Sequence, residues 1–331
     1  MTIPLAQSMW RSTRSPRVWC RDRYWRARDC VRRWRGERLM RVRGGYDNGT
    51  RIVPLERGAT GNAAIAQLLA TGKPAMVTRY GVYELRAVAG TALNDHALVR
   101  RWFFSLCHDA GFFPQDLSLV PRFAQVYLNA TRFIDALAAV NHRQGLYETE
   151  QWIFQTHCPH ARLIEFESID SFRYENPWTA ALEGKRVLVV HPFVETIRRQ
   201  YAKRKLLFAN PRVLPDFASL QIVPAIQSIA GNRVPFANWF DALDHMRRSI
   251  SNCDFDVALI GAGAYGLPLA AHVRQMGRQA VHMGGVTQVL FGIYGSRWQQ
   301  ELRHLINEHW VRPADHERPV GAFRVEHGCY W

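Results

Sequence analysis

The sequence lacks an apolar stretch long enough to cross a membrane, which takes about 18 residues. The best candidate, Val257 to Ala271, is interrupted by glycines and by Pro268. No apolar segment of the secretory type follows Met1. We therefore expect neither a transmembrane helix nor a secretion signal.

Paired cysteines and the common catalytic signatures are also missing. The six cysteines are scattered and none is in a C-x-x-C pair, which excludes a disulfide framework and favours reduced thiols in the cytoplasm. There is no G-x-S-x-G, no Walker loop and no H-E-x-x-H. The motifs of serine hydrolases, P-loop nucleotidases and zinc peptidases are thus absent.

Positive charge is abundant but uneven. The formal net charge is +15, yet residues 1–43 hold 13 Arg against three acidic residues, and the other 288 residues carry only +5. Residues 1–45 show no stable helical or strand period, so we expect a basic, disordered extension. The alternative is an arm that touches nucleic-acid phosphates or an anionic membrane. For the folded body we expect no specific nucleic-acid partner.

Segments with the patterns of strands and helices alternate in the second half of the chain. Strands are expected in 185–193, 219–228, 255–261 and 278–284, and helices in 194–208, 236–253, 264–277 and 296–310. In the first half, helices are expected in 62–72, 82–111 and 116–142, with one strand at Ala75–Thr78 and a second, short one in 162–172. The pattern predicts an α/β fold: a Rossmann-like parallel sheet with helices on both faces and a helix-rich N-terminal half. We expect one domain over 60–310, with the best seam at 174–178, followed by a C-terminal tail, 311–331.

A glycine pattern follows the expected strand 255–261. Gly261-x-Gly263-x-x-Gly266 leads into a helix, where backbone N–H groups can hold a phosphate. A dinucleotide site also needs an acid at the end of the next strand to bind the ribose hydroxyls. His282 stands there instead, so another nucleoside diphosphate fits better than NAD(P). Glycines that only permit close packing of strand and helix are the structural alternative.

Charged and polar side chains follow other expected strands at their carboxyl ends, where open parallel sheets bind ligands. Arg79 and Glu84 flank the turn at Gly81; the arginine suits a phosphate, and the glutamate suits a base or a metal ligand. An Arg–Glu pair that only caps the strand is the alternative. His191 and Glu195 follow the strand 185–193, ahead of a charged helix that includes Arg204. Gly284 and Gly285 begin a loop of the kind that closes over a ligand.

These motifs resemble a known family. "TRYGVYEL" resembles the R-F/Y-G-D-G-E stretch of the bacterial GT-D glycosyltransferases, and the order of elements after Lys185 is similar to that family's second half. "HPFVETIRRQY" and "GAYGLPLA", at His191–Tyr201 and Gly263–Ala270, resemble an uncharacterised branch associated with surface-polysaccharide clusters. The resemblance implies a Rossmann-like fold, a nucleotide-sugar donor and an acceptor hydroxyl.

The resemblance also implies a divalent metal, Mn²⁺ or Mg²⁺, held by a D-x-E motif. Glu84 matches the acid of that motif, but Val82 replaces its aspartate, and His282 replaces the aspartate of the second half. Both departures weaken the expectation of a metal. Without one, Arg79 and Arg204 would neutralise the leaving diphosphate.

We therefore expect a cytoplasmic glycosyltransferase of cell-surface polysaccharide synthesis, with a glycan or lipid-linked acceptor and peripheral association with the inner membrane surface. Its predicted catalytic residues are Glu84, Arg79, His191 and Glu195, with Glu84 as the candidate metal ligand. The predicted nucleotide-binding residues are Gly81, Gly261, Gly263, Tyr265, Gly266, His282, Gly284, Gly285 and Arg204. The alternatives are an NAD(P)-linked oxidoreductase and a nucleotide-binding protein without turnover.

Overall fold

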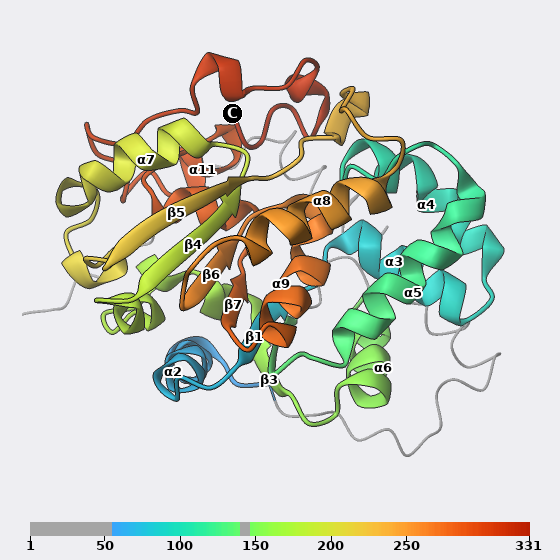
Figure 1. Cartoon of the computed structure of the whole chain (residues 1–331), viewed down its shortest axis with the longest axis horizontal. Helices are drawn as coiled ribbons and strands as arrows, with labels where there is room; N and C mark the ends of the chain where they lie inside the picture. The colour runs from blue at the N-terminus through green and yellow to red at the C-terminus, as the bar shows by residue number, and fades with distance from the viewer. Residues whose placement is uncertain (1–54, 140–145) are drawn as a thin grey trace, which may run out of the picture. The chain divides into compact units, whose positions relative to one another are not determined.

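The computed structural model describes residues 55–139 and 146–331, which belong to one compact unit. The predicted extension, residues 1–45, lies outside these ranges. The seven strands found in the described residues are β1 (Ala75–Arg79), β2 (Ala136–Ala139), β3 (Arg162–Glu165), β4 (Arg186–His191), β5 (Ser219–Pro224), β6 (Val257–Ile260) and β7 (Gln279–His282). They form one parallel sheet in the order β3-β2-β1-β7-β6-β4-β5 (Figure 1). Strands from both sides of the expected seam at 174–178 join this sheet.

Ten α-helices surround the sheet in the described residues. They are α2 (Gly58–Ala70), α3 (Val82–Ala92), α4 (His96–His108), α5 (Val120–Thr131), α6 (Tyr147–His157), α7 (Val194–Ala202), α8 (Trp239–Ser251), α9 (Gly266–Gln275), α10 (Thr287–Leu290) and α11 (Ser296–Glu301). The α/β prediction with helices on both faces is confirmed. No helix of the described ranges combines the length and the apolar character that a membrane crossing requires.

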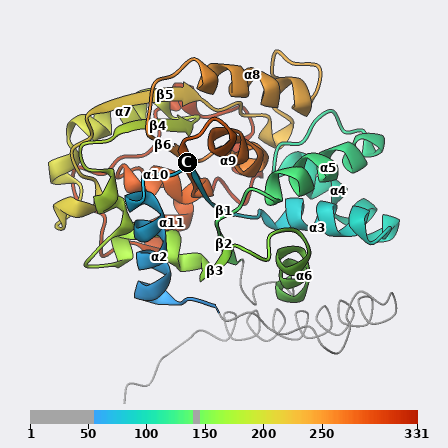
Figure 2. The same cartoon turned by 60° about the horizontal axis from the view of Figure 1, so that its bottom comes forward.

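Alternating side chains of each buried strand enter two separate cores. Leu188 and Val190 pack on one face with α3, α4, α5, α6, α8 and α9, whereas Val187 and Val189 pack on the other with α2, α7, α10 and α11 (Figure 2). The period of two follows from the pleat of the strand. Apolar residues at Val187–Val190 of β4 and throughout β6 are therefore required, because both faces of these strands are covered.

Two expected helices of the first half are wrong in part. Residues 136–139, expected to continue the helix before them, form β2 between β1 and β3. This Ala-Leu-Ala-Ala segment has high helix propensity, but all four residues are buried in the sheet, and burial in tertiary structure overrides propensity. The expected helix 82–111 is broken at Asn94, whose φ is 54°, and α4 restarts with Asp95 as its N-cap.

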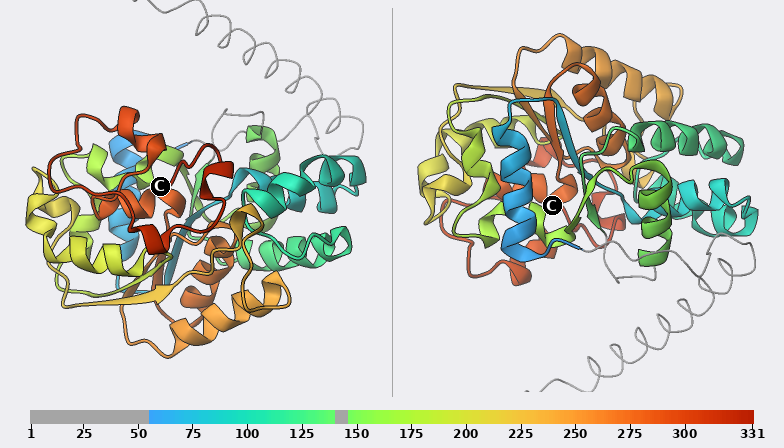
Figure 3. Two further views of the ribbon diagram at one scale, coloured as in Figure 1. Left: turned by 90° about the horizontal axis from the view of Figure 1, so that it is seen from above. Right: turned by 90° about the horizontal axis from the view of Figure 1, so that it is seen from below.

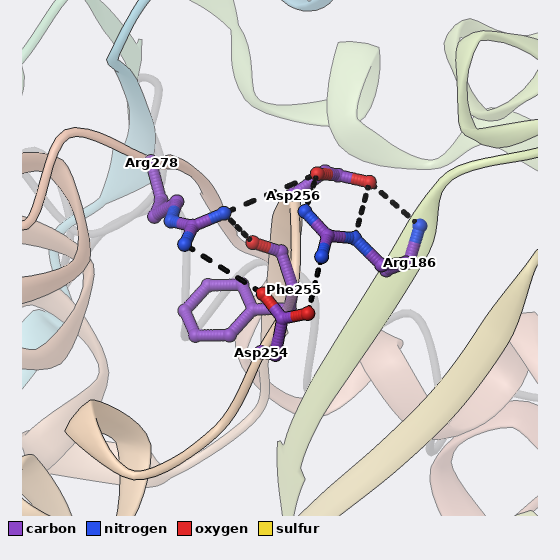
Figure 4. Close-up of polar contacts among 5 residues, drawn as sticks. All are labelled: Arg186, Asp254, Phe255, Asp256 and Arg278. Carbon is purple, nitrogen blue, oxygen red and sulfur yellow. Dashed lines mark hydrogen bonds and ion pairs between the residues drawn. The ribbon is translucent and has the colours of Figure 1, made fainter.

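Ion pairs join the amino ends of the central strands. Arg186, at the start of β4, donates from Nη2 to Asp256 Oδ1 at 2.6 Å and also pairs with Asp254. Arg278, just before β7, donates from Nη1 to the Phe255 carbonyl at 2.5 Å (Figure 4). These half-exposed pairs contribute little stability each. Their position leaves the opposite, carboxyl edge of the sheet for a ligand.

The C-terminal tail is part of the fold. Val311 bridges to Ile293, and Trp310, Val325 and Trp331 are buried in the same core as α7 and α10. Seen from above, this segment, in dark red, lies in front of the sheet (Figure 3, left). The expected helix 296–310 ends at Glu301, and the chain continues in turns.

Candidate functional site

The carboxyl ends of the central strands carry the side chains singled out from the sequence. From β1 the chain builds β2 and β3 on one side, and it returns to build β4 and β5 on the other. Arg79 ends β1, His282 ends β7, Gly261 follows β6 and His191 ends β4. An open parallel sheet binds its ligands at this edge, beside the point where the strand order reverses.

A cavity of about 100 Å³ lies at this edge. Its lining includes His191, Gln227, Ser228, Gly261, Ala262, Gly263, Tyr265, Gly285, Gln288, Tyr330 and Trp331. The lining thus combines residues that follow β4, β5 and β6 with the end of the C-terminal segment. Of the predicted residues, His191, Gly261, Gly263, Tyr265 and Gly285 meet here. We call this space the first cavity.

His191 presents a neutral ring to the first cavity. Its Nδ1 accepts a hydrogen bond from the Phe193 N–H at 3.1 Å. Burial lowers the pKa of the imidazole from 6.5 to about 3, so the ring is neutral near pH 7. A neutral imidazole whose Nδ1 accepts must carry its proton on Nε2. His191 therefore offers an N–H donor to the cavity and is not a base.

The glycines of the loop after β6 make room for two histidines. A Cβ on Gly261 would lie 2.6 Å from His191 Cδ2, and one on Gly266 would lie 2.0 Å from His282 Nε2. Gly263 has a φ of +50°, which favours glycine. Close packing therefore accounts for this pattern by itself. The match to a dinucleotide fingerprint carries no weight for NAD(P), because its glycines are needed for other reasons.

His282 is enclosed beneath the loop. Its Nδ1 lies 3.0 Å from Thr78 Oγ1, its Nε2 has no hydrogen-bond partner, and the side chain is 4 % exposed. Burial, together with the charge of the nearby Arg79, lowers its pKa to about 3. Since Nε2 faces Gly266, the ring neither binds ribose hydroxyls nor reaches the first cavity, which it does not line.

Both histidines should make the fold sensitive to acid. Each has a folded pKa depressed from 6.5 to about 3, so the unfolded chain binds more protons, and stability present above pH 6.5 is lost as the pH falls. We expect the free energy of unfolding to drop by about 1.4 kcal/mol per pH unit for each ring. Urea unfolding between pH 4 and 7 measures this slope. His191→Asn, which keeps an acceptor for the Phe193 N–H, should remove the part of this pH dependence that His191 contributes. If the free energy of unfolding still differed between pH 4 and pH 7 by as much as in the wild type, the prediction would be wrong.

Arg79 and Glu84 form a second group beside Gly284. The Arg79 guanidinium lies 4.6 Å from the centre of the Phe166 ring, and its Nε donates to the Tyr80 carbonyl at 3.3 Å. No carboxylate of the described residues forms an ion pair with it, and burial lowers its pKa. An arginine of this kind has donors left for an anion.

The Glu84 carboxylate folds back over the start of α3. A Cβ on Gly81 would lie 1.9 Å from Glu84 Oε2, so Gly81 is required by this side chain. Burial raises the pKa of Glu84, while backbone N–H groups of Glu84 and Tyr83 and the Arg79 charge oppose the shift. The expected Arg79–Glu84 cap is thus an electrostatic contact at the same strand end, without direct ion pairing.

Tyr330 connects the two groups. A Cβ on Gly285 would lie 2.4 Å from Tyr330 Cε1, and the Arg297 guanidinium lies 4.9 Å from the centre of the Tyr330 ring. The carbonyl of Tyr330 accepts from Gln288 Nε2 at 3.0 Å. Tyr330 therefore lines the first cavity and also lies near Arg79. Tyr330 belongs to the C-terminal segment, and no short-range pattern in the sequence indicates that this segment reaches the cavity.

Glu195 and Arg204 lie outside both the first cavity and the group of Arg79 and Glu84. Glu195 is exposed and lies 3.0 Å from His316 Nε2, while the α7 N-terminus is capped by Glu317, whose Oε1 accepts from the Glu195 N–H at 2.7 Å. Arg204 pairs with Asp216, which precedes β5 at the amino edge of the sheet. Arg204 therefore cannot serve the leaving diphosphate, and a protein carboxylate occupies the anion position at α7.

The chain is similar to solved structures at low sequence identity. No family model matches the chain, and no curated protein matches it. It is similar, at 13% identity and a TM-score of 0.45, to a selenomethionine-substituted structure of domain of unknown function 1792, over 85% of this chain and 96% of that one. A structure of the same domain described as having a distinct glycosyltransferase fold is 12% identical, with a TM-score of 0.44, over 80% and 92%. A structure described as a new glycosyltransferase from Streptococcus sanguinis is 14% identical, with a TM-score of 0.43, over 80% and 96%.

Proposed function

We propose that this chain is a glycosyltransferase that uses a nucleotide-sugar donor and a glycan or lipid-linked acceptor, in cell-surface polysaccharide synthesis at the inner membrane surface. The main support is the Arg79 guanidinium, which lies half-buried at the carboxyl edge and forms no ion pair with a carboxylate of the described residues. It lies at the same edge as the His191 donor and the glycine loop. The acceptor and the biosynthetic context rest on the sequence resemblance.

The arrangement suits the charge that develops in sugar transfer. When the bond between the anomeric carbon and the diphosphate oxygen breaks, negative charge accumulates on the leaving diphosphate. Arg79 and the Nε2–H of His191 are fixed donors that can stabilise this charge. Both are held by packing, on Phe166 and at the Phe193 amide, so little reorganisation is needed during the reaction.

Glu84 is the candidate base for the acceptor hydroxyl. As the acceptor oxygen bonds to the anomeric carbon, its proton passes to the Glu84 carboxylate. Burial raises the pKa of this carboxyl, which brings it closer to the working pH and makes it a better base. The backbone N–H groups at the start of α3 keep it ionised before the reaction.

The residues present do not fit a divalent metal. Val82 has no ligand atom, Glu84 is engaged by backbone amides, and His282 is closed off by Gly266. Over residues 55–139 and 146–331, no cluster of three or more His, Cys, Asp or Glu side chains could hold a metal ion. We therefore derive no step through a metal.

Metal removal is expected to have little effect. After dialysis against EDTA, donor affinity and turnover should stay within about two-fold of those in Mn²⁺ or Mg²⁺, because positive side chains replace the metal charge. Calorimetric titration of a nucleoside diphosphate and a donor-hydrolysis assay measure the two quantities. A loss of turnover that Mn²⁺ restores would show that a metal site exists.

The function itself is tested by a panel of ligands. UDP, GDP and CMP, their sugars, and NAD(H) are added to the full chain, and the shift of the thermal midpoint is recorded, since a ligand of the native state must raise it. The proposal expects a shift with one class of sugar nucleotide and hydrolysis of that donor. Binding without hydrolysis would favour a nucleotide-binding protein without turnover, and a shift with NADH alone would favour an oxidoreductase.

A further inference from the structure

A second cavity opens beside the first. It measures about 370 Å³, and its lining includes Phe112, Phe113, Gln115, Ser228, Asn232 and Phe236. Ser228 lines both cavities, and its Oγ donates to the Gly111 carbonyl at 2.6 Å. The segment from Asp109 to Phe113 borders both, with Asp109 and Ala110 on the first cavity and the two phenylalanines on the second. The two cavities therefore share a border, formed by Ser228 and this segment.

The first cavity is too small for a nucleotide sugar. Its volume is about 100 Å³. Sites for small molecules and cofactors usually measure about 300–1,000 Å³. The first cavity alone has room for a phosphate group. The second cavity, about 370 Å³, supplies the space that the rest of a nucleotide requires.

The linings of the two cavities differ in chemistry. The first holds the His191 ring, whose Nε2–H suits a phosphate oxygen. In the second, Phe113 and Phe236 are half-buried and offer aromatic surface to a planar base. Asn232 donates from Nδ2 to the Gln227 carbonyl at 2.8 Å, which leaves its Oδ1 to accept a hydrogen bond. Amide groups beside aromatic rings suit a nucleobase edge.

An acidic side chain, that of Asp109, belongs to the segment that borders both cavities. The Asp109 side chain is 17% exposed, and its Oδ1 lies 2.8 Å from His108 Nδ1. Asp109 lines the first cavity next to the segment that lines the second. A carboxylate is the group that binds the two ribose hydroxyls in nucleotide sites. The acid missing at the end of β7 thus has a counterpart at the end of α4.

We propose that the second cavity binds the nucleoside of a nucleoside diphosphate. The base lies against Phe113 and Phe236, the ribose hydroxyls bond to Asp109, and the diphosphate reaches the first cavity. This inference rests on the proposed function for the placing of the phosphates. The leaving phosphate of a donor then lies between the first cavity and Arg79, and its sugar extends toward Glu84.

Calorimetric titration of the full chain with UDP, GDP, ADP and CDP tests the inference. The tightest of them is compared with its 2′-deoxy and 3′-deoxy forms and with inorganic pyrophosphate. Phe236→Ala should lower the affinity for the nucleoside diphosphate by about ten-fold, because one stacking contact is lost, and should leave the affinity for pyrophosphate unchanged. Phe236→Leu, which keeps apolar volume, guards against misfolding. The control is Phe323→Ala, an exposed phenylalanine that lines neither cavity.

Asp109→Ala gives an independent measurement. In the wild type, removal of one ribose hydroxyl should weaken binding by about ten-fold, and in Asp109→Ala by less than about two-fold, because the acceptor is gone. Unchanged nucleotide affinity in both Phe236 variants, or a deoxy penalty that persists without Asp109, would overturn the inference. The second cavity would then suit the acceptor glycan.

The outcomes also separate this inference from the proposed function. If both variants act as expected but no nucleotide sugar is hydrolysed or transferred, the nucleoside site stands and the transferase does not. If a donor is turned over while the variants leave nucleotide affinity unchanged, the transferase stands and the nucleoside site does not. If no nucleoside diphosphate binds to the wild type, the nucleoside site is overturned.

Discussion

Replacing Arg79 with alanine is expected to lower sugar transfer by about 10²–10³-fold, the usual cost of removing one fixed donor from a developing charge. The guanidinium has no ion-pair partner among the described residues, so its loss leaves no protein carboxylate unpaired. The free energy of unfolding should therefore change by less than about 1 kcal/mol. Donor turnover under single-turnover conditions, together with urea unfolding, separates the two effects.

The matched control is Arg204→Ala. Arg204 was also expected from the sequence to neutralise the diphosphate, but it pairs with Asp216 at the amino edge of the sheet. Its replacement should leave turnover unchanged. Arg79→Lys keeps the charge but loses the planar donor pair, so turnover should recover only in part. Equal activity in the two alanine variants would remove Arg79 from the mechanism.

The strands of the second half could be predicted because each is a buried apolar run. In β4, Val187 to Val190 are β-branched or leucine, and both faces are covered, so the run itself is the signal. β2 lacked that signal, since its residues are alanine and leucine, which also favour helices. Its partner contacts are made with β1 and β3, more than 20 residues away in each direction, and no local pattern records them.

In the candidate site, too, some residues could be predicted from the sequence and others could not. His191 and Gly261 could be expected at one edge, because both directly follow parallel strands. Tyr330 and Glu317 come from the C-terminal segment and reach the edge through tertiary packing alone. The His282 side chain was placed in the nucleotide site from its position at the end of β7. Its burial depends on the missing Cβ of Gly266, a feature that the glycine pattern showed but did not explain.

Replacing Gly266 with alanine is expected to destabilise the fold by about 3 kcal/mol, at the upper end of the cost of overpacking a core. The φ of Gly266 is −58°, which any residue adopts, so backbone strain does not contribute. In a helix, alanine would by itself be the more stable residue. The expected loss therefore comes entirely from the collision between the new Cβ and His282 Nε2, 2.0 Å away. Urea unfolding measures it.

The double variant Gly266→Ala/His282→Ala decides whether this packing explains the glycine. His282→Ala alone loses the contact with Thr78 and leaves a cavity, but it also removes the ring that the new methyl group would meet. The destabilisation of the double variant should then be smaller than the sum of the two single destabilisations by about 2 kcal/mol. Coupling of this size is seen between residues in contact. Gly184→Ala is the contrast, because its φ of +67° is strained while nothing lies within 4 Å of its Cβ. Its cost should be additive with His282→Ala. Additive losses at Gly266 as well would mean that the histidine moves aside, and packing against His282 would then not explain this glycine.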